Sequence, residues 1–182
     1  MSKVLVPIAE GVEELEAVTI IDLLRRAEID VVVASLKQGP VKASRGVVLL
    51  ADMDLEQALE QEYDMVVLPG GAVGSDNLNN DERISELLKV MADSERFTAA
   101  ICAAPKVLAG AGVLKGHTIT AFPGVMAEVS DRPFTDSGAA VVKDRNIITS
   151  RGPGTAMDFA LALIAELAGS AKRDEVESQL KR

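Results

Sequence analysis

The segment that decides the fold is FTAAICAAPKVLAGAGVL, residues Phe97 to Leu114. It begins with a short apolar run, FTAAI, and continues into small, helix-forming residues. The single cysteine of the chain, Cys102, stands at the junction, and Pro105 follows three positions later. An apolar run that passes into a helix with proline near its start predicts a strand, a sharp turn and a helix. Cys102 is therefore expected at the carboxyl end of a strand.

Four more apolar runs are similar to FTAAI. They are rich in β-branched residues and bounded by Gly, Pro or Asp, as expected of strands buried on both faces. These runs are KVLVPIA (3–9), DVVVASL (30–36), YDMVVLP (63–69) and NIITS (146–150). Between these runs, apolar residues recur at helical spacing at 13–27, 84–91 and 105–111, which predicts three helices. In the first of them these apolar residues are Leu15, Val18, Ile21 and Leu24. The alternation predicts an α/β fold with a mostly parallel central sheet and helices on both faces.

Two stretches interrupt this alternation. Residues 39–55 predict a small β-hairpin with SRG (44–46) at its turn, and residues 118–150 predict short strands and loops that end in a hairpin turning over 143–146. Residues 152–169 predict a helix with Pro153 near its start and Gly169 at its end, and the polar tail predicts a short peripheral helix. We find no repeat or linker, so a single domain over residues 1–182 is expected.

The composition excludes several classes of function. A formal net charge of -9 disfavours nucleic acid and anionic membranes as partners. No apolar run approaches the roughly 20 residues needed to span a bilayer, and no signal peptide is recognisable. One cysteine and one histidine allow neither an internal disulfide nor a Cys/His zinc site. We therefore expect a cytoplasmic protein with no metal and no other cofactor.

Cys102 is the candidate nucleophile. In an open α/β sheet, ligands bind at the carboxyl ends of the strands, and the layout of strand, nucleophile and helix is that of a nucleophile elbow. Backbone N–H groups at a helix N-terminus favour a thiolate, so we expect the pKa of Cys102 to be lowered. The alternative is a small buried cysteine that ends a strand and has no chemical role.

Gly70 and Gly71 end another predicted strand, in VVLPGGAVG. Glycines let the backbone approach a ligand closely, and their N–H groups can point at a developing oxyanion beside the N–H of Ala103. A tight turn explains a glycine pair equally well.

Three glutamates open the first predicted helix. Glu14 is expected to be a solvated residue that interacts with the helix dipole. Glu16 lies along an apolar face, because the residues at helical spacing after it are Thr19, Ile20, Leu23, Leu24 and Ala27. Glu13 has nearly the same phase, and periodicity alone does not separate the two. A carboxyl group on such a face is either paired or protonated with a raised pKa, and a protonated one can move a proton to or from the thiol.

His117 is the only histidine. It precedes a predicted strand, so it should lie on the opposite edge of the sheet from Cys102, in an exposed loop. A protease or amidotransferase with a Cys-His pair would need this residue and is therefore disfavoured.

Five strings together resemble the ThiJ/PfpI superfamily, and closely its branch of the human parkinsonism-associated deglycase and YajL-like bacterial proteins. They occur in the family's order and span nearly the whole chain: EELEAV (13–18), SRGV (44–47), YDMVVLPGG (63–71), AAICAAP (99–105) and TSRGPGTAMDFAL (149–161). The resemblance implies a flavodoxin-like three-layer sandwich of the class I glutamine amidotransferase type, a homodimer, and a reactive cysteine on a strained elbow.

The resemblance also assigns roles to residues. It implies that Glu16 is the protonated carboxyl beside Cys102 and that Gly71 and Ala103 are the amide donors. The remaining pocket or dimer-interface positions that it implies are Gly70, Glu13, Asp22, Arg26, Arg45, Phe122 and Pro123. Phe122 marks a departure, because the human relative carries a histidine before this proline. Ala43 and Leu50 stand where relatives have further cysteines.

Two functions follow from the resemblance. The first is a cofactor-independent cysteine enzyme that converts small dicarbonyls such as methylglyoxal to D-lactate, or removes the same adducts from glycated amino groups. The second is a non-catalytic sensor of oxidative stress, or a redox-regulated chaperone, in which Cys102 is oxidised to the sulfinate.

Overall fold

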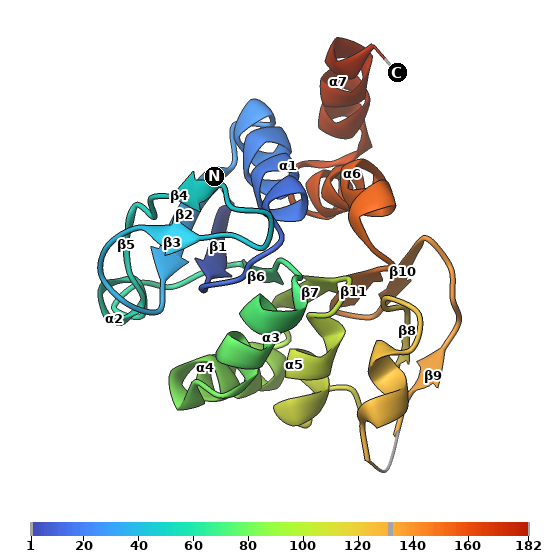
Figure 1. The fold of residues 1–182 in the computed structure, drawn as a ribbon. Helices are drawn as coiled ribbons and strands as arrows, with labels where there is room; N and C mark the ends of the chain where they lie inside the picture. Colours follow the sequence, from blue (N-terminus) through green and yellow to red (C-terminus); the bar gives the residue numbers. More distant parts are fainter. Residues whose placement is uncertain (1, 131–132, 182) are drawn as a thin grey trace.

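The computed structural model describes residues 2–130 and 133–181, and within them the chain forms a seven-stranded central sheet (Figure 1). The strand order is β10-β11-β7-β6-β1-β2-β5, and neighbours pair in parallel except β10 and β11. The bounds are β1 (Lys3–Ile8), β2 (Asp30–Ser35), β5 (Met53–Asp54), β6 (Met65–Leu68), β7 (Phe97–Ile101), β10 (Val141–Asp144) and β11 (Ile147–Ser150). The mostly parallel sheet confirms the predicted fold class.

Helices cover both faces of the sheet (Figure 1). One face carries α1 (Glu14–Arg26) and α6 (Ala156–Ala168), with α7 (Ser170–Leu180) packed on α6. The other face carries α2 (Leu55–Ala58), α3 (Ala72–Asn79), α4 (Glu82–Asp93) and α5 (Pro105–Gly110). The architecture is therefore the three-layer sandwich of flavodoxin-like proteins.

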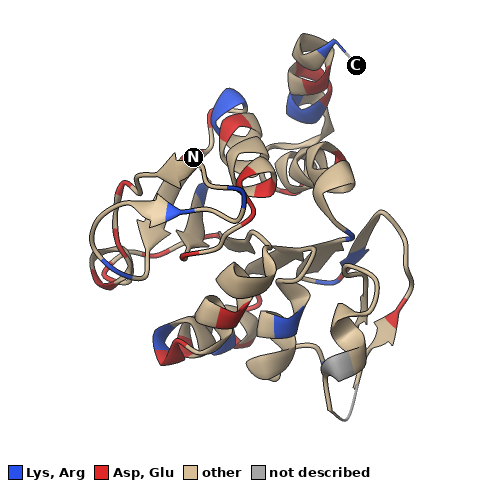
Figure 2. Ribbon diagram, in the orientation of Figure 1, with Lys and Arg blue, Asp and Glu red and all other residues tan. Residues whose placement is uncertain are grey.

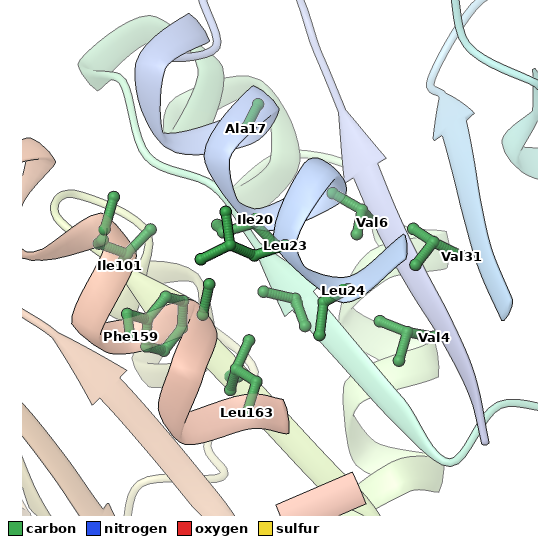
Figure 3. Close-up of a cluster of buried hydrophobic side chains, with 14 of the residues drawn as sticks. Val4, Val6, Ala17, Ile20, Leu23, Leu24, Val31, Ile101, Phe159 and Leu163 are labelled. Atoms are coloured by element: carbon green, nitrogen blue, oxygen red, sulfur yellow. The ribbon is translucent and has the colours of Figure 1, made fainter. Parts of the chain in front are cut away.

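Alternating strand residues build the two halves of the core. On β1, Val4 and Val6 face the layer of α1 and α6, whereas Leu5 faces the opposite layer. Figure 3 shows the first half, where Ile20 and Leu24 of α1 and Phe159 and Leu163 of α6 pack over the strands. β6 is buried at every position, and its sequence, MVVL, is continuously apolar.

Small elements extend the sandwich at its edges. A separate hairpin of β3 (Val41–Lys42) and β4 (Val48–Leu49) confirms the hairpin expected around SRG, and Asp144 pairs with Ile147 across the predicted second hairpin. The others are a parallel pair, β8 (Thr118–Ile119) with β9 (Thr135–Asp136), and 3-10 turns at Val125–Glu128 and Pro153–Thr155. The tail helix α7 is confirmed, and its Val176 is fully buried.

The hydrophobic periodicity did not predict two of the helices, and for a third helix it predicted the wrong buried face. Neither α2 nor α3 was expected, because α2 has only four residues and α3 is AVGSDNLN, which is rich in poor helix formers. Leu15 and Val18 were expected on the apolar face of α1, but they are 52% and 47% exposed. The buried face of α1 instead runs through Ala17, Ile20, Leu23 and Leu24.

Acidic and basic residues are interleaved along α1, α4 and α7 (Figure 2). The surface therefore mixes both signs of charge along its helices. None of the helices described is long and apolar enough to cross a bilayer.

Thr98 of β7 gives a direct test of the core. Its Oγ1 is buried and has no hydrogen-bond partner among the described residues. Thr98→Val should raise the free energy of unfolding in urea by about 1 kcal/mol, because a methyl group replaces an unsatisfied hydroxyl. The matched control is Thr149→Val, which should destabilise by about 1–3 kcal/mol, since Thr149 Oγ1 accepts the Thr120 N–H at 2.8 Å. Equal changes in the free energy of unfolding of the two variants would contradict this prediction.

Candidate active site at Cys102

Cys102 follows β7 directly and has a backbone φ of +64°, in the left-handed region that non-glycine residues rarely occupy. Two hydrogen bonds hold this conformation: the Cys102 N–H donates to Ser150 O at 3.0 Å, and the Phe122 N–H donates to Cys102 O at 2.8 Å. A strained residue fixed from both sides is typical of a functional turn. The strained elbow that the resemblance implies is thus present.

Glu16 lies in the first turn of α1 and is completely buried. The helix begins at Glu14, and Glu13 is its N-cap, whose carboxylate accepts the Glu16 N–H at 2.8 Å. The side chain of Glu16 accepts the Gly70 N–H at 2.8 Å through Oε2. No N–H or O–H group in the part of the chain that the structure describes donates to its other oxygen, Oε1. The ambiguity between Glu13 and Glu16 is therefore resolved, since Glu16 is the buried carboxyl.

The thiol and the carboxyl perturb each other. Burial raises the pKa of Glu16 from 4.5 to about 7, while the Gly70 N–H and the Cys102 thiol lower it and the charge of Glu13 raises it. Burial also raises the pKa of Cys102 from 9.0 to about 12, and the charge and hydrogen bonding of Glu16 add to the increase. The backbone amides of Gly71 and Ala103 act in the opposite direction on the thiol.

The expected lowering of the Cys102 pKa is therefore wrong. Helix α5 begins only at Pro105 and has six residues, so its N-terminus gives Cys102 little support. Cys102 is also only 9% exposed, and burial disfavours the thiolate more than two amides favour it.

The raised values describe a coupled pair rather than two independent groups. The charge of Glu16 raises the thiol pKa only while Glu16 is ionised. Once the pair has lost its first proton, near the pKa of about 7 of Glu16, one proton remains for the sulfur and the carboxylate to share. Glu16 can then accept the thiol proton as the sulfur attacks, so the pair can act without a permanent thiolate.

Glycines 70 and 71 make this arrangement possible. A Cβ on Gly70 would lie 2.5 Å from Glu16 Oε2 and 2.7 Å from the Cys102 Cβ. Gly71 has φ +92°, and a Cβ there would clash with the carbonyl of Gly11. Only glycine fits at either position, so the pair is more than a tight turn.

The burial of Glu16 predicts a pH-dependent stability. Its folded-state pKa is raised above 4.5, so the stabilisation is complete below pH 4.5 and is lost as the pH rises through about 7. When the pH is raised from 4.5 to 7.5, the free energy of unfolding of wild type should fall by about 3 kcal/mol more than that of Glu16→Gln, because the variant has no titrating group at position 16. Urea unfolding of both proteins at the two pH values measures this difference. Parallel changes in the two proteins would contradict the raised pKa.

A cavity of about 580 Å³ opens above the sulfur. The predicted site residues that line it are Cys102, Glu13, Arg45, Gly71, Ala103 and Phe122, and other lining residues include Glu10, Lys42, Ser44 and Val125. Gly70 and Glu16 are not among its lining residues; they are buried beside Cys102. A second cavity, of about 660 Å³, lies against Asn77 and Arg83 and is not lined by Cys102, so we place the candidate site in the first.

The remaining predicted site residues lie outside the lining of this cavity. Asp22 and Arg26 form an exposed ion pair at 2.6 Å further along α1, and Pro123 is exposed. Among the described residues, no group of three or more His, Cys, Asp or Glu side chains could hold a metal ion.

Two sequence predictions about single residues need correction. His117 does lie at the edge opposite Cys102, near Asp144, but it is only 9% exposed rather than in an exposed loop. Burial is the largest cause that lowers its pKa, so it stays neutral. Glu14 is not solvated either: it is 8% exposed and accepts hydrogen bonds from the hairpin turn. Helical periodicity carries no signal for such a contact with a distant hairpin.

The fold and the site together define an α/β sandwich with a cysteine elbow and a buried glutamate partner. Residues 2–166 match the DJ-1/PfpI family, and the chain belongs to this family. It is 44% identical to protein dj-1beta of Drosophila melanogaster over 99% of this chain and 97% of the other. The crystal structure of that DJ-1beta superposes with a TM-score of 0.94 and covers 99% of this chain and 98% of the other.

Two further relatives differ in how much of their own length matches this chain. DJ-1 homolog B of Arabidopsis thaliana is 45% identical over 93% of this chain, but the match spans only 39% of the Arabidopsis protein. A Caenorhabditis elegans relative is named glutathione-independent glyoxalase DJR-1.2, and it is 32% identical over 92% of this chain and 89% of its own length.

Proposed function

We propose that this protein is a cofactor-independent cysteine enzyme that converts small dicarbonyls to hydroxy acids, with methylglyoxal to D-lactate as its reaction. The single observation that carries the proposal is the coupled pair of Cys102, which lines a cavity, and Glu16, which is buried beside it, with the amides of Gly71 and Ala103 directed at the sulfur. A nucleophile, a proton acceptor and amide donors are the groups that this chemistry requires.

The first step is addition. The sulfur of Cys102 bonds to the aldehyde carbon of methylglyoxal, and the thiol proton passes to Glu16. The aldehyde oxygen takes up a proton and becomes the hydroxyl of a hemithioacetal. Amide donors near the sulfur stabilise the charge that develops on this oxygen before it is protonated.

The second step moves hydrogen between the two carbons. Glu16, which has passed the thiol proton to the aldehyde oxygen and is ionised again, removes the proton from the former aldehyde carbon, and an enediolate forms with its charge on the ketone oxygen. Return of a proton to the neighbouring carbon gives the lactate thioester of Cys102. Water then cleaves the thioester, releases lactate and restores the thiol, so the net change is methylglyoxal plus water to lactate and a proton. A carboxyl with a pKa of about 7 suits these transfers, since it gives and accepts protons near neutral pH.

The test is a direct assay. Purified protein and methylglyoxal, without glutathione, should produce D-lactate, which a stereospecific lactate dehydrogenase measures. The absence of lactate, or formation of a racemic product at the buffer rate, would overturn the proposal. The printed name of the C. elegans relative supports this choice of substrate. Glycated amino groups could enter the same addition through their aminocarbinols, and release of free amine from them would measure that activity.

A second candidate function is supported by the surroundings of the sulfur. The amides of Gly71 and Ala103 and the carboxyl of Glu16 could donate hydrogen bonds to the oxygens of a sulfinate at Cys102. Such a protein would be a non-catalytic oxidation sensor or a redox-regulated chaperone. Mass spectrometry after mild peroxide treatment tests this function. A gain of two oxygens at Cys102 would support a sensor, and an unmodified Cys102 would contradict it.

We further propose a cytoplasmic homodimer. Proteins of this family are typically dimeric. Leu15 and Val18 on α1 and Val48 and Leu50 at the β3–β4 hairpin are exposed apolar side chains, which are typical of an interface. Light scattering should give twice the mass of one chain, and a monomer at micromolar concentration would contradict this.

A further inference from the structure

Glu14 holds the turn between β3 and β4 from a distant part of the sequence. Its carboxylate accepts hydrogen bonds from Ser44 Oγ at 2.9 Å, from the Arg45 N–H at 2.8 Å and from the Val47 N–H at 3.4 Å. Glu14 is 8% exposed. Burial acts to raise its pKa, but the hydrogen bonds outweigh it and hold the pKa below 4.5, so Glu14 is ionised at neutral pH.

The turn that Glu14 holds is a wall of the cavity over Cys102. Four consecutive residues of this segment line the cavity, namely Lys42, Ala43, Ser44 and Arg45. The β3–β4 hairpin is not part of the seven-stranded sheet, so no sheet neighbour fixes it. Backbone bonds attach its first strand, with Lys42 O accepting the Gly11 N–H and Val12 O accepting the Ser44 N–H, both at 2.8 Å. Beyond Ser44, Glu14 is the group that attaches the turn to α1.

The first turn of α1 therefore carries carboxylates with separate roles. Glu13 caps the helix, Glu14 binds the hairpin turn, and Glu16 lies beside the sulfur. Because Glu14 and Glu16 are two residues apart in one rigid helix, the position of the wall is fixed relative to the reacting pair.

We propose that Glu14 is a positioning residue for substrate binding: it anchors the 44–47 turn so that the wall formed by residues 42–45 keeps its place in the cavity that Cys102 also lines. This inference rests on the proposed function for its effect on turnover. Glu14 does not line the cavity itself. Its loss should therefore weaken substrate binding and leave the chemical step intact.

The test compares wild type, Glu14→Gln and a matched control. In Glu14→Gln an amide NH₂ replaces one acceptor oxygen and opposes the N–H donors of the turn. We expect KM for methylglyoxal to rise about tenfold while kcat stays within about twofold, because the loss affects binding rather than the reacting pair. Amide hydrogen exchange at Arg45 and Val47 should be at least about tenfold faster.

Two further measurements do not depend on turnover. Alkylation of Cys102 by iodoacetate, relative to neutral iodoacetamide, should slow severalfold in Glu14→Gln, because the basic residues of the wall, Lys42 and Arg45, are then held less firmly beside the cavity that the anionic reagent enters. Ser44→Ala removes one of the hydrogen bonds and should give smaller changes in the same directions.

The matched control is Asp144→Asn. Asp144 also binds a distant backbone, accepting the Thr118 N–H at 2.7 Å, but it lies near His117 at the opposite edge of the sheet. This variant should leave KM, the alkylation ratio and exchange at Arg45 and Val47 unchanged. Unchanged exchange at Arg45 and Val47 in Glu14→Gln, or equal effects in Asp144→Asn, would overturn the role of Glu14. If wild type formed no lactate, the proposed function would fail, while exchange and alkylation would still decide the role of Glu14.

Discussion

Cys102→Ser should lower kcat/KM for lactate formation from methylglyoxal by at least about 1000-fold. The serine hydroxyl has a far higher pKa than the thiol and is a weaker nucleophile, so proton transfer to Glu16 and addition to the aldehyde both become harder. The strained elbow should remain in the variant, so the loss of kcat/KM should reflect the replacement of the sulfur and not a change in the backbone.

A folding control accompanies this substitution. Ser75→Ala also changes a fully buried small side chain, one helical turn after Gly71, and its hydroxyl has no partner among the described residues. It should retain wild-type activity, and Cys102→Ser should unfold at nearly the same urea concentration as wild type. A serine variant that kept most of the turnover would show that the sulfur is not the nucleophile.

Glu16→Gln should lower kcat by about 100-fold to 10,000-fold, the range for a general acid or base, with a much smaller change in KM. The pH dependence should change as well. In wild type, kcat/KM should rise with pH through about 7, because the pair must lose its first proton before Glu16 can accept the thiol proton. Glutamine cannot titrate, so this rise near pH 7 should be absent. Lactate formation measured between pH 5 and pH 9 gives both quantities.

Glu28→Gln is the matched control for Glu16→Gln. Glu28 lies just beyond the other end of α1, is exposed, and pairs with Lys172 at 3.3 Å. Its replacement should preserve kcat and the rise near pH 7. If Glu16→Gln kept that rise, another group would be responsible for it.

The sequence was sufficient for the sheet and the elbow because each is encoded locally. Inner strands such as β6 are buried on both faces, so they are continuously apolar and easily recognised. The position of Cys102 follows from the order of strand and helix in one segment. Glu16 was detected because a carboxyl on an apolar helical face is unusual, although periodicity could not distinguish it from Glu13 until the N-cap was known.

The properties that the sequence did not reveal depend on contacts between distant segments. Glu14 binds residues 31 and 33 positions further along the chain, which no helical pattern records. The pKa of Cys102 was expected to fall, because the layout of the elbow suggests a helix N-terminus at the sulfur. The actual start of α5 at Pro105 and the burial of the thiol reverse the direction. Local sequence places a nucleophile, whereas the three-dimensional packing sets its protonation.

The central claim is that Cys102 and Glu16 share one proton as a single unit. The most direct test is the pH dependence of Cys102 alkylation by iodoacetamide in wild type and Glu16→Gln. In wild type the rate should rise with a midpoint near pH 7, and in Glu16→Gln the midpoint should move above 9.0, since burial still disfavours the thiolate and no base remains beside it. The same midpoint in both proteins would contradict the claim.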